Sequence, residues 1–167
     1  TSYEYQNPDF FKGRTYGSST SKTIIHKISI NDNEIEYISK GEVKGRTINQ
    51  FSMDEHNGFF RIATQSGGYS KEKCSNVFVL DDKLKKVGEV TNIAPNENMH
   101  SARFMGNRAY LVTFLNIDPF FVIDLSDPYD PEILGELKIP GYSDYLHPFD
   151  ENHVIGIGKD SDASIDS

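Results

Sequence analysis

The sequence contains no tryptophan, one cysteine and no long hydrophobic segment. A single cysteine, Cys74, excludes an internal disulfide and a metal site built from several cysteines. A membrane-spanning helix needs about 18 consecutive apolar residues, and no window of the chain supplies them. The first residues also lack the basic-then-apolar pattern of a signal peptide. We therefore expect neither a membrane span nor a targeting segment in these 167 residues.

The sequence is also poor in basic residues and in catalytic motifs. Its 17 lysines and arginines face 25 acidic residues, which gives a formal charge of -8. This balance opposes binding to a phosphate backbone, so nucleic acid is not expected as a partner. The Gly-x-Ser-x-Gly, His-Glu-x-x-His and Gly-x-x-x-x-Gly-Lys patterns are absent. We expect no metal and no cofactor, and the sequence favours a protein that is not an enzyme.

What the sequence does contain is a repeat of short, strand-like segments. Three pairs of residues, each 45 positions apart, belong to one alignment: Phe104 and Phe149, Asn107 and Asn152, and Val112 and Ile157. A Gly-Glu-Val or Gly-Glu-Leu triplet recurs at about the same distance, beginning at Gly41, Gly88 and Gly135. This period is typical of four-stranded propeller blades.

The alternation of apolar and polar residues predicts six β-hairpins and almost no helix. One of them turns at Asn57-Gly58, a pair that favours the positive φ angles of a tight turn. We predict an all-β fold made of antiparallel four-stranded blades of a partial β-propeller. It would comprise an outer strand pair, two complete blades and an inner pair, at about 23–40, 49–90, 101–138 and 145–158.

These patterns divide the chain into three parts. Residues 1–22 are expected to form an arm or a loop remnant, 23–160 the propeller segment and 161–167 a truncated loop. Within the segment, 66–75 is expected to be an exposed polar loop that carries Cys74. Three blade equivalents are too few for a closed ring. The exposed blade edges therefore predict pairing with each other, with a second copy of the chain in a homo-oligomer, or with the missing blades of the full protein.

The blade sequences resemble a family of archaeal and bacterial secreted proteins with a C-terminal β-propeller domain distantly related to WD repeats. The matching stretches cover most of residues 41–158: 41–55, 60–64, 101–106, 110–114 and 118–148. The resemblance implies a propeller fold and an extracellular or cell-surface location. The family's domain is several times longer, which implies that this chain is an internal piece with a signal or anchor elsewhere.

Two histidines lie in matching places of consecutive repeats. His100 precedes one inner strand and His147 lies in the next, with Arg103 and Asp144 nearby in sequence. If inner strands line the channel, these groups converge on a ligand or metal site. The simpler interpretation is that His147 is a packed histidine bonded to the backbone.

Charged residues embedded in apolar blade sequence form a second group of candidates. Arg61, Arg103 and Asp118 each need a partner if they are buried. An arginine–carboxylate network between blades satisfies this need, and a clamp for a substrate carboxylate is the alternative. Glu55 and Asp144 are plausible partners in either case.

Two acidic segments resemble calcium loops. For 124–131 an Asx turn next to proline is the better explanation. For 160–166 we expect a solvated loop, because the glycine and the terminal glutamate of a twelve-residue calcium loop are missing.

We expect a binding module for a protein or glycan, with loops at 92–99, 115–119 and 140–145 facing the partner. Tyr145 fits the aromatic enrichment of interface cores. The alternative is an extracytoplasmic hydrolase or peptidase-related domain with its site at the channel mouth. That site would use four residues: Glu55, Asp118, Asp144 and His147.

Overall fold

A computed structural model describes residues 21–31, 34–68, 71–114, 118–139, 142–150 and 152–159. The expected arm and truncated loop therefore fall almost entirely outside the described residues. No α-helix occurs in the described part, and no helix there is long and apolar enough to cross a membrane. One 3-10 turn, η1 (Gln50–Ser52), precedes the third of twelve strands. The strands are β1 (Lys22–Asn31), β2 (Glu34–Lys44), β3 (Met53–His56), β4 (Phe59–Gly68), β5 (Lys71–Leu80), β6 (Lys86–Ile93), β7 (Asn98–Met105), β8 (Arg108–Phe114), β9 (Asp118–Asp124), β10 (Glu132–Ile139), β11 (Tyr142–Asp150) and β12 (His153–Lys159).

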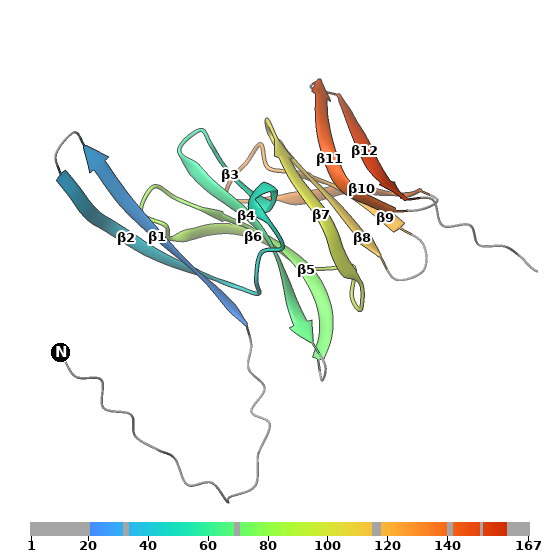
Figure 1. Cartoon of the computed structure of the whole chain (residues 1–167), viewed down its shortest axis with the longest axis horizontal. Coiled ribbons are helices and arrows are strands. Elements are labelled where there is room, and N and C mark those ends of the chain that lie inside the picture. The colour runs from blue at the N-terminus through green and yellow to red at the C-terminus, as the bar shows by residue number, and fades with distance from the viewer. Residues whose placement is uncertain are drawn as a thin grey trace, which may run out of the picture.

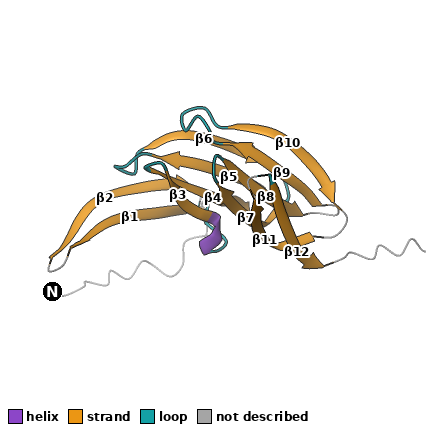
Figure 2. Cartoon of the chain, turned by 90° about the horizontal axis from the view of Figure 1, so that it is seen from above, coloured by secondary structure: helices purple, strands orange, loops and turns teal. Residues whose placement is uncertain are grey.

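The strands form four antiparallel sheets that follow one another along the chain (Figure 1). Two are complete four-stranded sheets, β3-β4-β5-β6 and β7-β8-β9-β10, and two are two-stranded, β1-β2 and β11-β12. Figure 2 shows β6 and β10 along one side of the molecule, with η1 and β11 toward the other. The all-β partial propeller predicted from the sequence is confirmed.

The two complete sheets are buried on both faces. In β5, Val77 and Val79 pack toward the β7–β10 sheet, whereas Phe78 and Leu80 pack toward Val43 in β2. Strand β8 repeats the arrangement, because alternate side chains point to opposite faces. Its Ala109 and Leu111 join the first core, and its Tyr110 and Val112 pack against Leu146 in β11. Each core is thus an interface between successive sheets.

The recurring glycine of the Gly-Glu triplets lies where the outer turn of the next sheet approaches. A Cβ atom at Gly41 would lie 2.6 Å from the carbonyl oxygen of Leu84, in the β5–β6 turn. At Gly88 a Cβ would collide with the carbonyl oxygen of Pro128, in the β9–β10 turn. At Gly135 a Cβ would meet no atom within 4 Å. The triplet therefore marks the place where the neighbouring hairpin turn packs, and among the described residues no turn packs on Gly135.

The expected exposed loop at 66–75 is wrong. Strand β4 continues to Gly68 and β5 begins at Lys71, so Cys74 lies inside a strand and is buried. Its Sγ lies 3.1 Å from Ser66 Oγ, which also accepts a hydrogen bond from Asn76 Nδ2 at 3.1 Å. The polar atoms of these small side chains form hydrogen bonds with one another inside the sheet. The composition of the segment does not reveal these bonds.

The local turn chemistry follows the sequence closely. Asn57 and Gly58 have φ angles of 51° and 80°, as their pairing predicts. Asp124 Oδ1 accepts a hydrogen bond from the Ser126 amide, and Asp127 Oδ1 accepts one from the Tyr129 amide, each at 2.9 Å. These Asx turns explain the acidic segment at 124–131 without calcium. Residues 160–166 lie outside the described part.

The close packing at Gly88 predicts a destabilising substitution with a matched control. Gly88→Ala forces the Cβ against the Pro128 carbonyl, and we expect it to lower the free energy of unfolding by about 1–3 kcal/mol. At Gly68 a Cβ meets nothing within 4 Å, so Gly68→Ala should change stability by less than about 0.5 kcal/mol. Urea denaturation followed by circular dichroism measures both, and equal effects would contradict the assignment.

Candidate functional site

Arg61 is buried and held by groups from two sheets. Its guanidinium donates to Asp54 from Nε at 2.8 Å and from Nη2 at 2.6 Å, and its Nη1 donates to the Gly106 carbonyl at 2.6 Å. The Phe104 ring centroid lies 5.3 Å from the guanidinium carbon. Arg61 therefore fastens β3 and β4 to the β7–β8 turn, as expected for an arginine–carboxylate tie between blades.

Four side chains form a continuous row from β7 through η1 to β11, which we call the inner-strand row. Arg103 in β7 lies over the Phe51 ring of η1, with 5.1 Å from the guanidinium carbon to the ring centroid. Phe51 in turn contacts the Tyr145 ring edgewise at 5.6 Å. Tyr145 Oη lies 3.2 Å from Nδ1 of His147. The candidates Arg103, Tyr145 and His147 are thus brought together, joined by an aromatic residue that sequence reasoning missed.

The other candidates are distributed differently. His100 Nδ1 lies 3.7 Å from Asp144 Oδ1, which links β7 to β11. Glu55 is exposed on β3, and the side chain of Asp118 lies outside the described part. Among the described residues, no group of three His, Cys, Asp or Glu side chains could hold a metal ion. Asp144 and His147 are thus engaged by different neighbours instead of converging on one centre.

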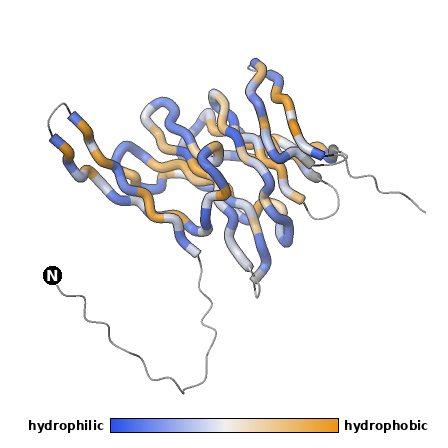
Figure 3. Tube along the Cα trace, viewed as in Figure 1, coloured by the Kyte–Doolittle hydropathy of each residue, from blue (hydrophilic) through white to orange (hydrophobic). Residues whose placement is uncertain are grey.

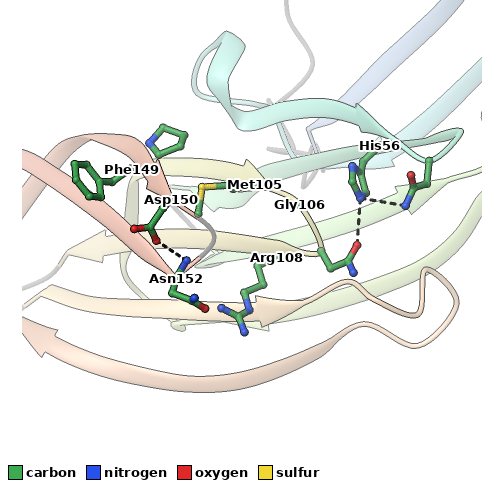
Figure 4. Close-up of a pocket in the computed structure, with 10 residues that line it drawn as sticks. His56, Met105, Gly106, Arg108, Phe149, Asp150 and Asn152 are labelled. Atoms are coloured by element: carbon green, nitrogen blue, oxygen red, sulfur yellow. Dashed lines mark hydrogen bonds between the residues drawn. The ribbon is translucent and has the colours of Figure 1, made fainter.

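A pocket of about 790 Å³ lies where the inner hairpin turns of three successive sheets meet. Figure 4 shows Met105, Gly106 and Arg108 between His56 on one side and Phe149, Asp150 and Asn152 on the other. We call it the turn pocket, and ten residues line it: His56, Asn57, Met105, Gly106, Asn107, Arg108, Pro148, Phe149, Asp150 and Asn152. Its lining combines amide, imidazole, guanidinium and carboxylate groups with a methionine and a phenylalanine. Such a mixture suits a polar ligand with apolar patches.

Hydrogen bonds fix the polar groups of the turn pocket. His56 Nε2 lies 3.1 Å from Asn107 Oδ1 and 3.1 Å from Asn57 Nδ2. The backbone N–H of Asn152 donates to Asp150 Oδ1 at 2.8 Å, and His153 Nδ1 lies 2.8 Å from the same oxygen. The Asn152 amide, followed by His153, lowers the pKa of the Asp150 carboxyl. Asp150 is therefore an anionic acceptor on the rim at neutral pH.

Sequence reasoning missed the turn pocket, although the repeat contained a signal for it. Asn107 and Asn152 are equivalent positions of the 45-residue repeat, so they belong to the same rim of successive blades. The repeat does not predict the exposure of Phe149. Its equivalent, Phe104, is 7% exposed, whereas Phe149 lies at a register shift between Pro148 and Asp150 and is 68% exposed. A bulge re-aims a side chain without leaving a clear mark in the sequence.

Comparison with known proteins agrees with this geometry. Residues 12–166 match the family described as Beta propeller domain. The chain belongs to this family. Membership agrees with the stacked four-stranded sheets, and it confirms the propeller resemblance seen in the sequence.

Two archaeal relatives of this Beta propeller domain segment carry no described function. An uncharacterized protein of Methanocaldococcus jannaschii is 45% identical over 145 residues, which covers 86% of the chain. An uncharacterized protein of Archaeoglobus fulgidus is 42% identical over 147 residues, which covers 88% of the chain. The chain spans 23% of the length of each relative. No solved structure matches the chain.

The buried ion pair predicts a contrast between two neighbouring acidic residues. Asp54→Asn leaves the Arg61 guanidinium buried without its carboxylate, and we expect the free energy of unfolding to fall by about 3 kcal/mol. Glu55→Gln changes an exposed residue next to it and should cost less than about 0.5 kcal/mol. Thermal and urea denaturation of both variants measure the two changes in the free energy of unfolding. An equal loss of stability in Glu55→Gln and Asp54→Asn would contradict the prediction.

Proposed function

We propose that this segment is the ligand-binding part of an extracytoplasmic β-propeller, and that the turn pocket receives a protein or glycan ligand. The observation that carries the proposal is the convergence of three hairpin turns around a pocket of about 790 Å³. The polar groups of that pocket sit on the turns or on the strand residues next to them, away from the packing that uses the strand interiors.

The chemistry of the lining supports a ligand with many hydrogen-bonding groups. Asn57, Asn107 and Asn152 each present an amide that donates and accepts, while Arg108 donates only and Asp150 accepts only. The exposed ring of Phe149 adds an apolar face beside them. Peptide backbones and sugars both offer alternating donors, acceptors and apolar patches, and both are compatible with this lining.

Catalysis finds less support in the same residues. Two of the four residues expected for a hydrolase, Asp144 and His147, contact His100 and Tyr145 respectively. Glu55 is exposed on β3, and of the hydrolase candidates whose side chains the structure describes, Glu55, Asp144 and His147, none lines the turn pocket. A binding role therefore accounts for the arrangement with fewer assumptions.

The extracytoplasmic location rests on the family resemblance of the sequence. Protease treatment of intact archaeal or bacterial cells that express the parent protein tests it directly. Digestion of the propeller segment while a cytoplasmic marker stays intact is the expected result. Protection of the segment until the cells are lysed would contradict this part of the proposal.

Binding through the turn pocket is tested with glycan and peptide arrays, followed by titration of the best-bound probe. Arg108→Ala should raise the Kd of that probe about tenfold or more, because a hydrogen bond to a charged group contributes about 1.5–3 kcal/mol. Asn152→Ala removes a neutral amide and should raise Kd about two- to tenfold, which corresponds to about 0.5–1.5 kcal/mol. Arg46→Ala and Asn98→Ala change the same residue types outside the pocket and should leave Kd unchanged. Equal Kd values for all four variants, or no binding to either array, would contradict the proposal.

A further inference from the structure

The three hairpin turns around the turn pocket each carry an asparagine: Asn57, Asn107 and Asn152. They differ in the residue that follows. Gly58 follows Asn57 and is the only glycine after an asparagine in the sequence, whereas an arginine and a histidine follow the other two. The side-chain amide of an asparagine can react with the backbone nitrogen of the next residue, and a side chain on that residue obstructs the approach. Glycine, which has no Cβ, leaves the approach open.

The Asn57-Gly58 turn is open to solvent. Both residues are exposed, and a Cβ at Gly58 would meet no atom of the described residues within 4 Å. His56 pairs with Phe59 across the turn, and the hydrogen bond that closes such a turn joins these two outer residues. The backbone N–H of Gly58 is therefore not used to close the turn. The chain is also hydrophilic around the β3–β4 turn (Figure 3), so water reaches this nitrogen and the turn can adjust without displacing a packed neighbour.

His56 holds a proton beside the nitrogen of the Asn57 side chain. Its Nε2 lies 3.1 Å from Asn107 Oδ1 and 3.1 Å from Asn57 Nδ2, and these two contacts are the dashed lines from His56 in Figure 4. An amide oxygen accepts a hydrogen bond from Nε2 only when that nitrogen is protonated. The Asn107 contact thus keeps a proton on Nε2, within hydrogen-bond distance of the nitrogen that leaves when the Asn57 amide reacts.

We propose that Asn57 is a modification site, at which the folded protein loses the side-chain amide and forms an aspartyl or isoaspartyl residue. The backbone nitrogen of Gly58 forms a bond to Cγ of Asn57 and gives its proton to water. The bond from Cγ to Nδ2 breaks, and Nδ2 takes the proton from His56 Nε2 and leaves as ammonia. His56 regains a proton from water. A water molecule then opens the cyclic imide at either carbonyl carbon, so the reaction needs no oxidant, no reductant and no reactant besides water.

The reaction changes both the charge and the backbone of the turn. Arg108 and Asp150 contribute opposite formal charges to the turn pocket, so a new carboxylate in place of the Asn57 amide makes the sum of these charges negative at neutral pH. The isoaspartyl product also adds a main-chain carbon between His56 and Phe59, which lengthens a turn whose length fixes the strand register. The effect of these changes on a ligand rests on the proposed function, whereas the chemistry at Asn57 does not.

Peptide mapping by mass spectrometry tests the modification in the folded protein. After incubation of the intact protein at neutral pH, we expect the peptide that contains Asn57 to separate into amide, aspartyl and isoaspartyl forms. The peptides that contain Asn107 and Asn152 come from the same pocket in the same digest and should keep their amides. Equal loss of ammonia at all three positions, no loss at Asn57, or loss at Asn57 only after the protein is unfolded would overturn the proposal.

A matched pair of histidine variants tests the role of His56. His56→Gln keeps a hydrogen-bonding amide but removes the imidazole proton, and we expect it to slow the loss of ammonia at Asn57 about tenfold or more. His153→Gln removes a histidine that contacts Asp150 in another of the three hairpins and should leave the rate unchanged. Circular dichroism spectra equal to that of the unmodified protein establish that both variants are folded. Equal rates in the two variants would overturn the assignment of His56 as the proton donor.

Discussion

Face-to-face stacking of twisted sheets is the interaction on which this structure depends. A sheet in the middle of the stack has no solvent face, so both sets of alternating side chains in β5 and in β8 must be apolar or internally bonded. Burial of each large apolar side chain contributes about 1.5–3 kcal/mol. The close approach that makes this burial possible requires glycine where an outer turn meets the preceding sheet, as at Gly41 and Gly88. The recurring triplet is thus a packing requirement.

The same requirement determines where ligand-binding groups are placed. Side chains in the middle of a stacked sheet are used by the neighbouring sheets, and even a charged one such as Arg61 is fully engaged by Asp54 and the Gly106 carbonyl. At the hairpin turns and along the inner strands, polar groups are not covered by a neighbouring sheet in this way. The turn pocket and the inner-strand row lie in these two places, and they touch the same strands, β7 and β11. Stacking therefore leaves the polar side chains that are available for a ligand at the hairpin turns and along the inner strands.

Much of this architecture could be predicted because it is encoded locally or by repetition. Asn57-Gly58 determines its own turn, and the 45-residue period relates Val112 to Ile157 before any coordinates are known. Features that depend on contacts between distant segments could not be predicted. Cys74 is buried because Ser66 and Asn76 surround it across the sheet, and Phe149 is exposed because a register shift re-aims it. Similarly, the link from Arg103 through Phe51 to Tyr145 joins residues almost a hundred positions apart.

Amide hydrogen exchange tests burial of the middle sheets on both faces most directly. If sheets stack on both sides, the amides of β5 and β8 should be the slowest to exchange, at rates governed by global unfolding. Those of β6 and β10, each at the edge of its sheet, should exchange faster through local opening. Exchange in β5 and β8 as fast as in β6 and β10 would contradict the stacked arrangement.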